Sequence, residues 1–117
     1  MSIRRISIPA RSVVDAGDTI LTASETGETQ IKKLSINNTA PVGGGTGSTA
    51  LFSLHRVANG GVADKTNEIA TDVALNAGES KTPFQSMDVV LDFEESIQIV
   101  TASTNLVVHG WYLVNTS

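Results

Sequence analysis

The stretch from Ser96 to Val114 constrains the fold more than any other part of the chain. It contains two apolar-rich runs, separated by the small and polar residues of positions 102–105. Both runs can be divided into two faces with a period of two, and β-branched residues are frequent, which indicates strands rather than helix. A linker of this length and composition is typical of a hairpin loop. We therefore predict that the two runs form a closing β-hairpin.

The second run carries the only tryptophan and the only tyrosine, Trp111 and Tyr112. Because of these two residues, we expect the hairpin to supply much of the bulkiest core. Consecutive side chains of a strand point to opposite faces of the sheet. We therefore expect one aromatic to lie in the core. The other would then be either a boundary residue with its polar atom in water or an interface anchor covered by a second subunit.

Comparable runs, separated by turn residues, recur along the rest of the chain at a spacing of about ten residues. They cover residues 2–9, 19–23, 29–37, 49–57, 68–75 and 88–93, with an extended segment at 81–87. No segment keeps helical periodicity over a helix length, although residues 58–67 could form one short turn capped near Asp64. The pattern predicts an all-β, two-sheet antiparallel sandwich of about eight short strands, either jelly-roll or immunoglobulin-like.

The first twelve residues form a separate segment, and residues 13–117 form a single β-sandwich domain in this interpretation. The segment alternates in polarity, and Pro9 either ends the strand or confines it to a sheet edge. A terminal segment stays ordered only if something holds it. We therefore expect residues 1–12 to be an N-terminal arm or an edge strand that joins the sheet or reaches a neighbouring subunit. The candidate interface residues are Ile3, Arg4, Arg5, Ile6, Ile8, Trp111 and Tyr112.

Composition excludes several classes of protein. The chain has 117 residues and no cysteine, so disulfide scaffolds and thiolate sites are excluded. No apolar run approaches the roughly 20 residues of a membrane span, and we expect no membrane partner. The net charge is −4. The basic residues do not cluster with aromatics, so we expect no nucleic-acid partner. The first half of the chain is more basic than the second, which either steers docking to an acidic partner or reflects ordinary surface charge.

The sequence offers no convincing catalytic or metal site, and we expect neither enzyme activity nor a cofactor. His55 and His109 lack the nucleophile and orienting carboxylate that a catalytic histidine needs, so a histidine bonded to backbone is expected. The acidic residues 88–95 lack the spacing of a calcium loop and fit a solvated strand edge. The glycine-rich stretch 43–47 has no following lysine and no helix, which argues against a phosphate loop.

The turn and strand pattern from Asp18 to Asn115 resembles that of small virion proteins of tailed bacteriophages. The matching pieces are DTILTASETGETQIKKLSINNT, then TALFSLHRVANGGVADKTNEIATDVALNAGES, then MDVVLDFEESIQIVTASTNLVVHGWYLV. The chain departs from that pattern at GGGTG and at the His-Gly-Trp-Tyr ending. The resemblance covers most of the chain, but it consists of turn residues rather than a reactive motif.

The resemblance implies a non-enzymatic structural role, with assembly in the bacterial host cytoplasm and a final location in the virion. The first expectation is a capsid decoration, or cement, protein that binds the major capsid protein and forms a homo-oligomer, with a trimer favoured. An alternative is a tail, collar, baseplate or fibre-associated protein of the same fold. A further alternative, from a different class, is a β-sandwich module that binds carbohydrate or the host surface.

Overall fold

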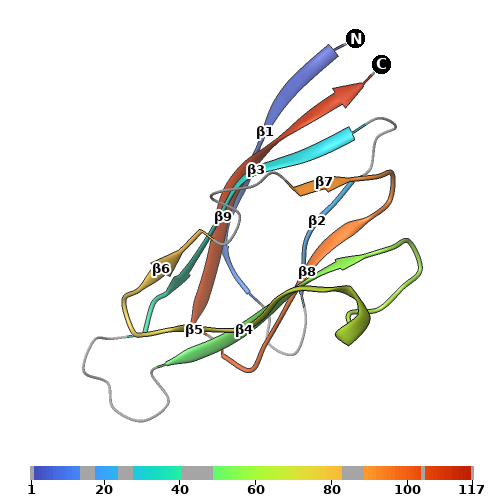
Figure 1. Cartoon of the computed structure of the whole chain (residues 1–117). Coiled ribbons are helices and arrows are strands. Elements are labelled where there is room, and N and C mark those ends of the chain that lie inside the picture. The colour runs from blue at the N-terminus through green and yellow to red at the C-terminus, as the bar shows by residue number, and fades with distance from the viewer. Residues whose placement is uncertain are drawn as a thin grey trace.

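The architecture is given by a computed structural model of the chain, which describes residues 2–13, 18–23, 28–40, 49–82, 89–103 and 105–116. The glycine-rich stretch 43–47, the segment around Pro83 and the acidic Asp88 lie outside these ranges. The described residues form β-strands joined by turns, with one short 3₁₀ helix (Figure 1). The prediction of an all-β, two-sheet antiparallel sandwich is confirmed.

The strand bounds follow the predicted runs closely. The strands are β1 (Ser2–Ser12), β2 (Asp18–Thr22), β3 (Glu28–Asn38), β4 (Ala50–Val57), β5 (Glu68–Leu75), β6 (Ser80–Lys81), β7 (Val89–Leu91), β8 (Ser96–Thr101) and β9 (Leu106–Thr116). The 3₁₀ helix η1 (Lys65–Asn67) has Asp64 as its N-cap, which is the second of the two alternatives, a plain loop or a short turn capped near Asp64, that the sequence allowed. The Asp64 carboxylate accepts a hydrogen bond from the Thr66 backbone N–H, which satisfies an otherwise unpaired donor.

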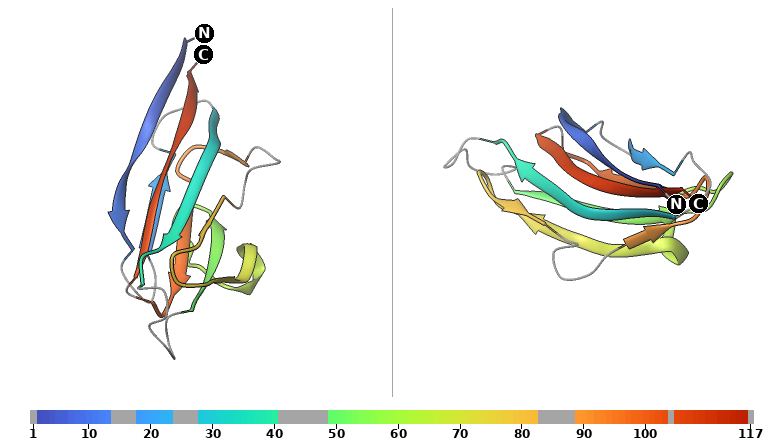
Figure 2. Two further views of the ribbon diagram at one scale, coloured as in Figure 1. Left: turned by 90° about the vertical axis from the view of Figure 1, so that its left-hand side faces the viewer. Right: turned by 90° about the horizontal axis from the view of Figure 1, so that it is seen from above.

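Strand order identifies the sandwich as a jelly roll. One sheet, the β9 sheet, has the order β1-β9-β3-β6, with β7 also paired to β3, and the other, the β8 sheet, has the order β2-β8-β4-β5. Because β6 and β7 lie along the same edge of β3, they act as one interrupted strand. Every connection except β4–β5 then crosses between the two layers, which Figure 2 shows edge-on. Two four-strand layers linked in this way distinguish a jelly roll from an immunoglobulin-like sandwich.

The prediction that residues 96–101 and 106–114 form a closing hairpin is wrong. Strand β8 pairs with β2 and β4, whereas β9 pairs with β1 and β3 in the other sheet. The chain therefore passes from one layer to the other between Thr101 and Leu106, instead of turning back within one sheet, and stacked sheets lie about 10 Å apart. Its Ser103 backbone N–H donates to the Thr101 hydroxyl, and the Asn105 backbone N–H donates to the Ser103 hydroxyl. These side-chain acceptors take the place of hairpin hydrogen bonds and hold the crossing turn.

Aliphatic side chains and one phenylalanine fill the core between the sheets. Its fully buried members include Ile31, Leu34, Ile36, Phe52, Leu54, Leu75, Leu91, Ile97, Ile99, Leu106 and Val108. Tyr112 packs against this core, as one of the two aromatics was expected to do, but Trp111 lies on the opposite face of β9 and is only half-buried. The expectation that Trp111 and Tyr112 provide much of the bulk is therefore wrong, because Phe52 is the largest fully buried side chain.

Strand β1 lies at the edge of the β9 sheet and runs antiparallel to β9 along its full length. It continues past Pro9, and its register with β9 shifts between Ile8 and Arg11, as a proline in an edge strand allows. The two chain ends lie side by side at one tip of the molecule, where β1 and β9 extend beyond the β8 sheet (Figure 1).

Candidate interaction surface

The candidate interface residues from the sequence all lie on the β1–β9 pair, but they divide between its two faces. Ile3, Arg5 and Trp111 lie on the outer face, which is turned away from the β8 sheet. Arg4, Ile6, Ile8 and Tyr112 occupy inner-face positions, where Ile8 joins the core and Arg4, near the tip, stays exposed. Only the outer-face group and the tip are therefore open to a partner.

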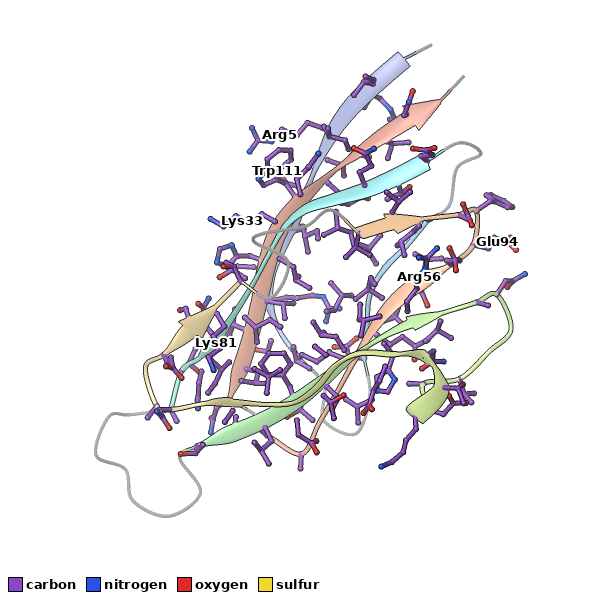
Figure 3. All side chains as sticks on the ribbon, in the orientation of Figure 1. Arg5, Lys33, Arg56, Lys81, Glu94 and Trp111 are labelled. Atoms are coloured by element: carbon purple, nitrogen blue, oxygen red, sulfur yellow. The ribbon has the colours of Figure 1, made fainter. Side chains whose placement is uncertain are left out.

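Trp111 is the centre of the outer face. The Arg5 guanidinium carbon lies 4.3 Å from the centre of the indole ring, a cation–π contact. Across the sheet, Ser7 of β1 and Lys33 of β3 flank Trp111 in register. Figure 3 shows Arg5, Trp111 and Lys33 projecting from their three strands to the same side of the molecule. The outer face thus combines an aromatic surface with two cationic groups.

Sequence reasoning missed Lys33, although a signal for it exists. The alternation of polarity in β3 is irregular at Lys32 and Lys33, and the β3–β9 register shifts between Ile31 and Lys33. A bulge of this kind adds one residue to a strand and re-aims the next side chain. It places Lys33 opposite Trp111, at a groove of about 340 Å³ that these two residues line together with Lys32, Leu34 and Thr82.

Edge strands expose unpaired backbone groups, and three of the four sheet edges are blocked. On β2, the Arg11 guanidinium donates to the Thr19 carbonyl at 2.8 Å. On β5, Lys81 Nζ donates to the Ala74 carbonyl at 2.8 Å, and Asp72 interrupts the strand with a φ of 45°. Strands β6 and β7 are only two and three residues long. Short strands, bulges and lysine side chains are the usual protections of a sheet edge.

The fourth edge, that of β1, is long and regular over its first part. Residues 2–8 keep a continuous antiparallel register with β9, and Ile3 is 61% exposed. An edge of this kind can take up an additional strand from another protein. Arg4 and Arg5 give this strand two positive charges, and across paired strands opposite charges are favourable whereas like charges are unfavourable. The β1 edge therefore suits an acidic extended segment.

The two histidines lie in different sheets and do not form a common site. The His55 ring is buried, and its Nδ1 lies 2.9 Å from the Asp64 carbonyl oxygen and 2.8 Å from Asn67 Oδ1. This confirms the expected histidine bonded to backbone, and the role it indicates is to fasten η1 to β4. His109 lies on the outer face of β9, opposite Ser35. Within the described ranges, no three histidine or acidic side chains gather into a metal-binding cluster.

The acidic residues after β7 are partly neutralised by β4. Arg56 makes a bidentate contact with Glu95, with Nη2 2.7 Å from Oε1 and Nε 3.1 Å from Oε2. Glu94 accepts a hydrogen bond from the Asn59 side chain at the same end of the molecule (Figure 3). The Arg56 hydrogen bonds lower the pKa of Glu95 below its ordinary value of 4.5. This arrangement holds the turn after β7.

This ion pair makes stability depend on pH. Because the pKa of Glu95 is lower in the folded than in the unfolded chain, its contribution is present above pH 4.5 and is lost as pH falls through the folded pKa. In Arg56→Gln, we expect the loss of unfolding free energy on acidification from neutral pH to about pH 3 to shrink by roughly 1 kcal/mol. Urea unfolding at the two pH values measures this free energy, and Lys65→Gln, which removes one positive charge elsewhere, is the control. An unchanged acid dependence in Arg56→Gln would contradict this role.

Comparisons with known proteins do not indicate a function, so the geometry is the main guide to it. None of the described residues forms a helix of the length and hydrophobicity that crossing a membrane requires. No protein-family model matches the chain, and neither a curated protein nor a solved structure matches it significantly.

Proposed function

We propose that this protein is a structural component of a bacteriophage virion, specifically a capsid decoration protein that binds the outer surface of the capsid lattice. The observation that carries the proposal is the β1 edge, which is the one long, regular sheet edge left open in the described part of the chain. The blocked edges elsewhere indicate that the fold resists unspecific strand pairing. An open edge in such a fold has a use, and strand addition to a partner is the use that its chemistry favours.

The mechanism is mechanical. The sandwich is a rigid block, and the β1 edge adds backbone hydrogen bonds to an extended acidic segment of the major capsid protein or another virion protein. Arg5 already contacts the Trp111 ring, and a contact that restricts its side chain reduces the freedom lost when it pairs with a carboxylate. Each contact is weak, and many copies arrayed on a lattice gain through multivalency. A symmetric oligomer, with a trimer favoured, adds to this effect.

A second candidate is a tail, collar, baseplate or fibre-associated protein. The same edge and the same outer face would serve it, because strand addition does not depend on which part of the particle supplies the acceptor. The two proposals differ in location, and particles separated into heads and tails would distinguish them by the fraction that retains the chain.

A charge reversal tests the β1 surface. Particles of the source phage assembled without the protein are mixed with Arg5→Glu or with the wild type, and binding is measured by co-sedimentation. Arg5→Glu removes the contact with Trp111 and places a negative charge at the docking edge. We expect the binding to particles to weaken at least roughly tenfold, which corresponds to about 1.4 kcal/mol.

The matched control is Lys65→Glu, which makes the same change in net charge. Lys65 is exposed in the helix η1, between β4 and β5. This variant should bind like the wild type. Equal weakening in both variants would mean that net charge alone matters, and unchanged binding in Arg5→Glu would exclude the β1 surface. Deleting all of β1 is a poorer test, because Ile8 belongs to the core and its loss would destabilise the fold.

A further inference from the structure

A second surface feature lies on the other sheet, at the end of the molecule away from the chain termini. It is a groove of about 530 Å³ that crosses β4 and the end of β8. Its lining includes the side chains of Thr49, Leu51, Asp72, Ser103 and Asn105. The volume falls within the range of small-molecule sites. The groove has no part in the β1 contact proposed above.

The backbone at Asp72 is unusual for its position. Asp72 has a φ of 45°, in the left-handed region, in the middle of β5 where the register with β4 shifts between Phe52 and Leu54. Glycine is the residue that suits a left-handed bulge position, because a side chain there costs energy. The Asp72 backbone N–H donates to the Ser53 hydroxyl at 3.0 Å, and that hydroxyl donates in turn to the Asp72 carboxylate at 3.4 Å, so Ser53 holds the bulge. The bulge turns the aspartate side chain to the groove.

Glu94 is the second non-glycine residue with positive φ among those described, and it has a local explanation. It is the third residue of the turn in which the Glu95 backbone N–H donates to the Asp92 carbonyl at 3.0 Å. A positive φ at that position belongs to a type II turn. Asp72 lies within a strand instead of a turn, and the Ser53 hydroxyl lies 3.4 Å from its Oδ1, so the bulge holds a carboxylate that lines the groove. Strained positions of this kind concentrate at binding sites.

The lining indicates the chemistry of a ligand. Asp72 and Asn105 are exposed, and they offer hydrogen-bond acceptors and an amide donor. The hydroxyls of Thr49 and Ser103 add further donor and acceptor groups, and Leu51, which is 54% exposed, offers an apolar surface. None of the described residues that line the groove is cationic, which disfavours an anion. Neighbouring hydroxyls above an apolar C–H face are the features of a sugar ring.

We propose that this groove binds a neutral sugar, with the Asp72 carboxylate accepting hydrogen bonds from adjacent ring hydroxyls and Leu51 contacting the C–H face. A decoration protein exposes most of its surface to the medium, and a weak sugar site there would bring the particle to a glycan-covered cell surface. The site stands on its own geometry and does not require the β1 edge to bind a capsid.

The test uses the full-length chain and the methyl glycosides of glucose, galactose and mannose, added separately at millimolar concentration. Amide chemical shifts are followed by NMR. At least one hexoside should shift the amides of Asp72, Ser103 and Asn105 in a saturable way. In Asp72→Gly the affinity should fall by roughly tenfold or more, as expected for the loss of charge-assisted hydrogen bonds. The melting temperature of this variant should stay close to that of the wild type, because the strain that glycine relieves offsets the lost hydrogen bond from Ser53 and the added freedom of the unfolded chain.

Two further variants complete the design. Glu94→Gly relieves the strain of a positive φ at a residue outside the groove, and it should leave sugar binding unchanged. Asp72→Asn keeps the side-chain size and should weaken binding as Asp72→Gly does. Arginine amide is the competing probe: saturable shifts with arginine amide alone would overturn the sugar proposal in favour of a cationic partner. The absence of shifts with every hexoside, or full binding by both Asp72 variants, would also overturn it. Loss of particle binding by Arg5→Glu is a separate outcome and bears only on the β1 surface.

Discussion

Replacing Gly110 with alanine is expected to prevent the chain from folding or to lower its free energy of unfolding by more than about 4 kcal/mol. An alanine Cβ at this position would lie 1.9 Å from the Lys33 carbonyl oxygen and 3.1 Å from the Leu34 Cα. Both atoms belong to the backbone of β3, which pairs with β9 along its full length. The overlap can be relieved only by separating the two central strands of the β9 sheet.

Gly110 pairs with Leu34, directly after the register shift in β3 between Ile31 and Lys33. A glycine within a strand often marks such a contact. Chemical denaturation and circular dichroism measure the loss. The control is Gly61→Ala, where the new Cβ would meet an exposed loop at 3.1 Å from the Ala58 carbonyl, and we expect a cost below about 1 kcal/mol. A folded Gly110→Ala variant of near wild-type stability would contradict the described β3–β9 packing.

The second large effect is expected at Phe52. This residue is 1% exposed and is the largest fully buried side chain in the core between the sheets. Truncation to alanine removes its apolar contacts and leaves a cavity, which typically costs about 3–5 kcal/mol. Urea unfolding of Phe52→Ala should therefore show a large fall in the transition midpoint with a cooperative curve, because the remaining core still joins the two sheets.

Phe93 provides the matched control, since it is 48% exposed in the turn after β7. The same substitution there should cost less than about 1 kcal/mol. Equal destabilisation at both positions would mean that Phe52 does not occupy the core described above. Phe52→Leu should lie between Phe52→Ala and the wild type, because it retains part of the buried volume.

The sequence pattern predicted the strands and their faces because both depend on local alternation. In β9, Val108 and Tyr112 face the core and Trp111 faces outward, as a period of two requires. The same pattern could not identify the pairing partners. The runs that became β8 and β9 have the spacing of a hairpin, yet each is buried on one face of a different sheet. Register and neighbours depend on contacts between residues far apart in the chain, which a local pattern does not contain.

The candidate interaction surface was predicted only in part, for a related reason. The arm residues and Trp111 were recognisable as exposed apolar and cationic groups, but the Arg5–Trp111 contact needs the β1–β9 register. Lys33 joins the same face only because a bulge shifts the alternation. The left-handed conformation of Asp72 was equally unpredictable, since an aspartate in an alternating run carries no sign of it.

The proposed role in a phage virion depends most directly on what the β1 edge contacts. A reconstruction, at side-chain resolution, of a particle that carries this protein would test it. If the proposal is right, jelly-roll density lies on the outside of the capsid shell, with a strand of a neighbouring protein paired to residues 2–8 and a carboxylate near Arg5. A particle without this density, or one in which the outer edge of β1 faces only solvent, would contradict it.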